Sequence, residues 1–113
     1  MLALTFAAFF AAAQPVDEPP PPPELTEAGN DWNACVQDRV EEADEDLSPA
    51  RTVDAALAAC RPLQEAMTAH HRRWVDGSNL SAREKTQALR TMEQSLTQIR
   101  PQFIRMVREM RED

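Results

Sequence analysis

Apolar side chains recur at steps of three and four residues from about residue 30 to the end of the chain. This spacing is typical of one face of an α-helix, and no stretch shows the strict alternation of a half-buried strand. Two groups of turn-forming residues, Ser48-Pro49 and Asp76-Gly77-Ser78-Asn79, divide the pattern into three stretches. The pattern therefore predicts an all-α fold with three helices.

The first two helices are predicted to form an antiparallel hairpin around Ser48-Pro49. The first would begin at Asn30, a favourable N-cap residue. The second would begin with Ser48 as its cap and Pro49 in the first turn, where the missing N–H is not needed. Pro62 lies within the second helix and predicts a kink. The two apolar faces comprise Trp32, Cys35, Val36, Val40, Ala43 and Leu47, and then Val53, Ala56, Leu57, Cys60, Leu63, Met67, His70 and Trp74.

Gly77 is predicted to end the second helix in a left-handed conformation, and Ser81 with Glu84 forms a capping box that opens the third. The third helix has the most regular apolar stripe, with the a/d spacing of a coiled coil, and Pro101 predicts a bend in it. At about 45 Å it would extend past the first helix. Either the kinked second helix or another chain would then cover its far end, so we predict that this stripe binds a second copy or a partner helix. The stripe comprises Leu89, Met92, Leu96, Ile99, Phe103, Met106 and Met110.

The two cysteines lie almost symmetrically about the first turn. Cys35 is thirteen residues before Ser48, and Cys60 is twelve residues after it. At about 1.5 Å per residue, both would stand roughly 18–20 Å from the turn, each on an apolar face. We therefore predict a Cys35–Cys60 disulfide. The expected architecture is an all-α, disulfide-stapled antiparallel helical hairpin plus a long third helix.

The chain is predicted to be exported. Residues 1–13 form a short, uncharged apolar run that ends in three alanines, as in a signal peptide. A membrane-retained segment and a buried helix are alternatives, but about twelve helical residues are too short to cross a bilayer. Residues 14–29 are predicted as a Pro-rich acidic linker and residues 30–113 as the helical domain. We expect a periplasmic or secreted protein with no membrane span after cleavage, where a disulfide can persist.

Charge is unevenly distributed. Residues 14–50 carry eleven acidic side chains and one basic one, whereas residues 51–113 carry eleven basic and eight acidic ones. We expect the acidic first helix to lie beside the basic later helices, and the run from Glu41 to Asp46 to form a loosened, solvated turn. Weak binding of a divalent cation or of a basic partner are alternatives for that run. The net charge of −7 argues against nucleic-acid binding.

No catalytic arrangement is recognisable, because no hydroxyl or thiol has an identifiable base and orienting acid. We therefore predict no enzyme activity, no cofactor and no small-molecule substrate. Met67 and His71 are four residues apart and could suit copper in an exported protein. The competing interpretation, which we prefer, is a core methionine and a histidine near a helix end, so no metal site is predicted.

Two resemblances bear on function. The layout Trp32-x-x-Cys35-Val36, Ser48-Pro49-Ala50 and Ala58-Ala59-Cys60 resembles small exported two-cysteine helical proteins of Gram-negative bacteria. The segments Leu25-Thr26-Glu27-Ala28-Gly29 and Leu96-Thr97-Gln98-Ile99-Arg100 partly resemble the LTxxQ motif of chaperone-like envelope stress proteins, but both lack its glutamine. The expected function is a non-catalytic interaction or structural module of the cell envelope. The alternative is a periplasmic metal- or stress-responsive, chaperone-like helical protein.

Overall fold

The computed structural model describes residues 20–112, so the predicted signal peptide and the first part of the linker lie outside the described residues. Within this range the chain forms four helices and no strand: α2 (Pro23–Glu42), α3 (Pro49–Ala59), α4 (Arg61–Asp76) and α5 (Ala82–Glu112). The prediction of an all-α fold is confirmed.

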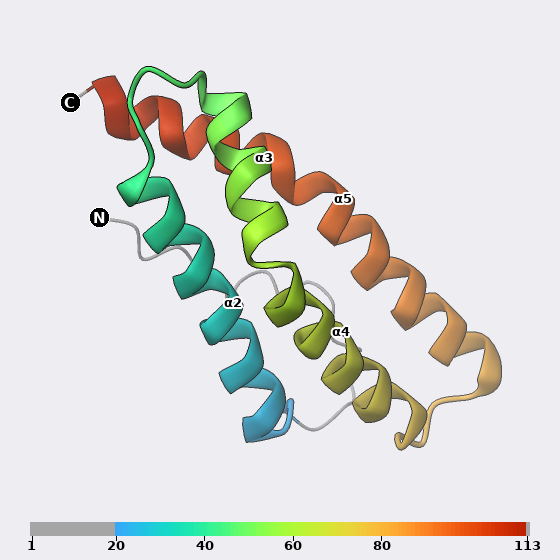
Figure 1. Ribbon diagram of the computed structural model, residues 1–113. Helices are drawn as coiled ribbons and strands as arrows, with labels where there is room; N and C mark the ends of the chain where they lie inside the picture. Colours follow the sequence, from blue (N-terminus) through green and yellow to red (C-terminus); the bar gives the residue numbers. More distant parts are fainter. Residues whose placement is uncertain (1–19, 113) are drawn as a thin grey trace.

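The four helices make an elongated bundle of 49 × 21 × 21 Å. Helices α3 and α4 follow one another as a single broken rod, with α2 on one side and α5 on the other (Figure 1). Both α2 and α5 pack against both halves of this rod. The predicted three-helix arrangement is therefore correct in outline, and its middle helix is divided in two.

Helix α2 begins seven residues earlier than expected. Pro22 has an extended backbone with φ −62° and ψ 152°, and its carbonyl oxygen accepts hydrogen bonds from the amides of Leu25 (3.0 Å) and Thr26 (3.2 Å). Pro23 occupies the first turn, where its fixed φ suits a helix. Leu25 is completely buried, so it extends the apolar face toward the N-terminus. The N-cap assigned to Asn30 was wrong, and residues 23–29 of the predicted linker are helical.

The break between α3 and α4 occurs at Cys60, two residues before Pro62. Cys60 has φ −98° and ψ 11°, and its carbonyl oxygen accepts from the amides of Leu63 and Gln64, both at 3.1 Å. A proline cannot donate to the preceding turn, and its ring crowds the carbonyl four residues earlier. The predicted kink is therefore present, and it is sharp enough to end one helix and begin the next.

The helix ends otherwise follow local chemistry, with one exception. The Ser48 hydroxyl accepts from the Arg51 amide at 3.2 Å. Ser81 and Glu84 form the predicted capping box, with amide-to-side-chain distances of 2.9 and 3.2 Å. Gly77, however, has φ −85° and ψ 0°, so the left-handed conformation predicted for it was wrong. It lies where a Cβ would come within 3.3 Å of the Arg73 carbonyl oxygen, which favours glycine by close approach.

Helix α5 continues through Pro101 without a break. Figure 1 shows its C-terminal part turning to pass α3, so this end of α5 lies against the first half of the broken rod. The core between the helices contains Trp32 and Phe103, whose rings meet edge-on at 6.0 Å between centroids. This contact joins the first and last described helices through the centre of the bundle.

Candidate functional site

The apolar stripe predicted as an interaction surface lies against the chain's own core. Met92, Phe103 and Met106 are buried, with Phe103 only 6% exposed. Leu96, Ile99 and Met110 are half-buried and pack against the same cluster, and Leu89 is half-buried as well. The far end of α5 is therefore covered within the chain, because α3 and the ring of Trp32 lie over it.

Arg111 holds the C-terminal end of α5 to the turn between α2 and α3. Its guanidinium donates to the backbone carbonyl oxygens of Leu47 and Asp44, and to the Thr52 hydroxyl at 3.0 Å. Thr52 is itself buried in α3. One side chain thus connects the end of α5 to two segments, the α2–α3 turn and α3, that are more than fifty residues from it in sequence. The sequence offered no signal for this contact, because Arg111 resembles any other arginine in the last turn of a helix.

The predicted disulfide is present. Cys35 of α2 and Cys60 are bonded, with their Cα atoms 6.0 Å apart. Cys60 is buried at the break between α3 and α4, whereas Cys35 is half-buried at the surface between α2 and α4. The bond therefore ties the middle of α2 to the break between α3 and α4.

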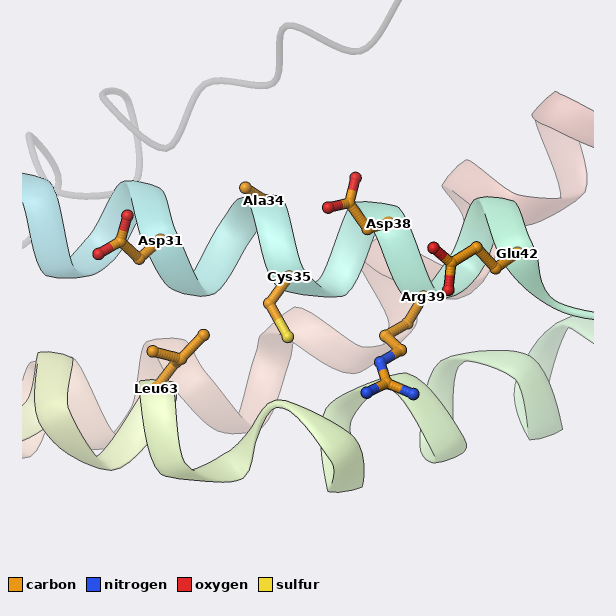
Figure 2. A pocket seen from close by; sticks show the side chains of 7 residues that line it. All are labelled: Asp31, Ala34, Cys35, Asp38, Arg39, Glu42 and Leu63. Carbon is orange, nitrogen blue, oxygen red and sulfur yellow. The ribbon is translucent and has the colours of Figure 1, made fainter.

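Beside the disulfide, a shallow and open groove runs between α2 and α4 (Figure 2). Cys35, Arg39 and Leu63 project into the space between α2 and the broken rod, while Ala34 and Asp38 project from the side of α2 that faces away from α4. Leu63 is 36% exposed and, with Leu47, is one of two large hydrophobic side chains exposed among residues 20–112. The groove is lined by Asp31, Ala34, Cys35, Asp38, Arg39, Glu42 and Leu63.

Leu63 belongs to a longer exposed apolar surface, which we call the alanine face. Its members follow one another at helical steps along the outer side of α3 and α4, across the break at Cys60, and all of them are exposed. None of these residues is charged, and Leu63 is the one large side chain among them. The alanine face consists of Ala55, Ala58, Ala59, Pro62, Leu63, Ala66 and Ala69. The sequence did not predict this face, because large side chains marked the apolar face of each helix and alanines did not.

The acidic side of α2 has no intramolecular basic partner in the described part of the chain. Residues 23–47 carry nine exposed acidic side chains and one basic one, Arg39. Within residues 20–112, an ion pair joins Arg100 of α5 to Asp54 of α3, at 2.7 Å. The hydrogen bonds and positive charge of Arg100 lower the pKa of Asp54. The acidic helix does lie beside α3 and α4, as expected, but no direct ion pair joins them within residues 20–112.

His71 and Met67, the copper candidates, both lie in the core. His71 is 1% exposed, and its Nε2 has no hydrogen-bond partner among the described residues. Burial, and to a lesser extent the charge of Arg72, lowers the pKa of His71, so the neutral imidazole is favoured. The assignment of His70 to the apolar face was wrong, since His70 is only half-buried and accepts a hydrogen bond at Nδ1 from Arg73. Residues 20–112 contain no group of three His, Cys, Asp or Glu side chains placed to hold a metal ion.

None of the four helices between residues 20 and 112 is long and apolar enough to cross a membrane. Comparison with protein-family models, with curated proteins and with solved structures found no match for this chain.

Proposed function

We propose that this protein is an exported, non-catalytic interaction module that presents the alanine face to a partner. The observation that carries the proposal is the continuity of that face: seven exposed, uncharged residues run along both halves of the broken rod. Charged and polar side chains usually cover a solvated helix surface, and a contiguous apolar area on a soluble protein often marks an interaction site. Small side chains also let another backbone approach closely.

The rest of the molecule supports this role by keeping the face in one shape. The disulfide holds the broken rod against α2 at Cys60, next to the middle of the alanine face. On its other side α5 packs along both α3 and α4. A surface held rigid before binding loses less conformational entropy on association than a flexible one does.

Export is proposed on two grounds. A disulfide persists in oxidising compartments such as the periplasm or the exterior of the cell. The apolar N-terminal run of residues 1–13 has the composition of a signal peptide. Docking on the α5 stripe, which the sequence predicted, would require the bundle to open, because Met92, Phe103 and Met106 are buried in it.

Site-specific photo-crosslinking tests the proposal. A photoreactive amino acid is placed at Ala59 or Ala66 on the alanine face, and at Thr86 or Gln87 on the exposed side of α5 as matched controls. In cells that export the protein, we expect one discrete adduct from the face positions and none from the controls. A ladder of many adducts from the face would favour the chaperone-like alternative, and equal adducts from face and control positions would refute the proposal.

A further inference from the structure

The alanine face borders the acidic side of α2, and the groove beside Cys35 and Leu63 is where the two surfaces meet. Cys35 and Leu63, which lie between the two helices, give this groove an apolar floor. Three carboxylates on α2, those of Asp31, Asp38 and Glu42, also line the groove, and Figure 2 shows Asp38 on the side of that helix away from α4. An apolar floor with one charged edge is the surface that an amphipathic segment complements.

The spacing of the carboxylates suits a helix. Asp31, Asp38 and Glu42 are seven and four residues apart, so they lie about 10 and 6 Å apart along the axis of α2. Lysine or arginine side chains at the same intervals on a second helix would meet them in turn, while that helix's apolar face rests on Leu63 and the alanines. Arg39 is the one basic side chain in the lining, so the edge remains net negative.

Charge also decides between occupants. A second copy of this chain, a nucleic acid and an anionic lipid surface would each bring net negative charge to a protein whose own net charge is −7. A basic segment would be attracted, because no ion pair within residues 20–112 involves the acidic side chains of α2.

We infer that the groove between α2 and α4 is a docking site for a basic amphipathic helix of a partner protein. Its apolar face packs on Leu63 and the adjoining alanines, and its basic side chains pair with Asp31, Asp38 and Glu42. This inference rests on the proposed function, since it names the partner chemistry that the alanine face accepts.

The test uses the oxidised protein and two synthetic peptides of about 18 residues, long enough for a helix of about 27 Å. Both peptides carry leucines on one face, and the other face carries lysines in one peptide and glutamates in the second. Fluorescence anisotropy of the labelled peptides measures the Kd at low and at physiological salt. The groove variant combines Asp31→Lys with Asp38→Lys. The matched control combines Glu93→Lys with Glu109→Lys on the exposed side of α5, which changes the net charge by the same amount. A third variant, Leu63→Ser, removes the large apolar side chain.

We expect the lysine peptide to bind, and the groove variant to weaken binding at least about tenfold while the control changes it less than about twofold. Leu63→Ser should also weaken binding of the lysine peptide. Added salt should reduce the difference in Kd between the groove variant and the control variant, because it screens the charges. Circular dichroism verifies that each variant keeps its helix content.

Four outcomes would overturn the inference. Equal weakening by the groove and control variants would show that only overall charge matters. Equal binding of the glutamate peptide would show an apolar docking face without charge selection, which leaves the proposed function standing. No binding of the lysine peptide would exclude the partner chemistry itself. A dimer in light scattering that Leu63→Ser dissociates would make a second copy the occupant of the face.

Discussion

Removal of the disulfide is the sharpest test of how this bundle is held together. The perturbation is the double variant Cys35→Ala with Cys60→Ala, compared with the oxidised protein. The bond closes a loop with a sequence separation of 25 between its ends, and it attaches α2 to the chain at the break between α3 and α4. Without the disulfide, the unfolded chain gains conformational entropy, and in the folded protein no covalent bond holds α2 to the break between α3 and α4.

The magnitude follows from the loop. In the chain-entropy description, closing a loop of this length lowers the entropy of the unfolded state by an amount equivalent to about 3.5 kcal/mol at 25 °C. Loss of the buried sulfur of Cys60, which is 1% exposed, adds to the cost because alanine leaves a small space. At about 4–8 °C per kcal/mol for a domain of this size, the Tm should fall by roughly 15 °C or more.

Thermal and urea unfolding followed by circular dichroism measure the effect. Reductant should lower the Tm of the parent protein to near that of the double variant and leave the double variant itself unchanged. The double variant treated with reductant is therefore the control for any general effect of the reagent. If the parent melts within about 2 °C of its oxidised value when fully reduced, the argument that the staple supports the broken rod is wrong.

Three further perturbations address the other contacts. Arg111→Ala removes the donors that hold the α2–α3 turn, so the free energy of unfolding in urea should fall by about 1–3 kcal/mol. The control is Arg108→Ala, which lies on the exposed side of the same turn of α5 and should change the free energy of unfolding by less than about 0.5 kcal/mol. Phe103→Ala empties a core position that the sequence assigned to a partner, and it should cost about 3–5 kcal/mol against less than about 1 for the exposed Leu47→Ala. Because the pKa of His71 is lowered in the folded protein, the unfolded chain alone binds a proton as the pH falls below its ordinary value of 6.5. Stability should therefore decline from about pH 6.5 downward, and His71→Gln should flatten that decline in urea titrations between about pH 5 and 7.5.

Each of these results can contradict its premise. An Arg111 effect no larger than that of Arg108 would mean that the turn does not depend on its carbonyl contacts. A Phe103→Ala protein of unchanged stability that has lost only self-association would restore the intermolecular role of the α5 stripe. If the free energy of unfolding depends on pH identically in the parent and in His71→Gln, groups other than His71 cause the loss of stability in acid. Carboxylates such as Asp54, whose pKa is lowered by Arg100, lose their charge only at lower pH and so do not interfere.

Local signals predicted most of the fold because they depend on few atoms. Ser81 and Glu84 satisfy one another's backbone amides over a single turn, so the capping box could be read from the residue types. The pairing of the cysteines followed from counting helical rise on both sides of one turn. The start of α2 was missed because no polar cap marks it. A proline preceded by an extended residue begins the helix, and the burial of Leu25 extends it.

The candidate site was harder to predict. Large side chains on α5 predicted an interaction stripe, but only packing determines whether a stripe faces its own chain or another. Here the ring of Trp32 contacts the ring of Phe103 in the core, so the stripe on α5 is covered by the chain's own first described helix. The exposed alanines of α3 and α4 gave no signal, because alanine is a strong helix former that is used at surface positions as well as in cores.

By itself the sequence determined the helical class, the breaks at Pro49, Pro62 and Gly77, and the place of the disulfide, since propensity, capping and helical rise act within a few turns. Only the tertiary structure decided which face of each helix is left outside. The reason is that burial depends on how the bend of α5 and the break at Cys60 bring distant helices together, as when Arg111 reaches the turn before α3. That same packing turned the predicted binding stripe inward and left the alanine face, beside the acids of α2, as the surface open to a partner.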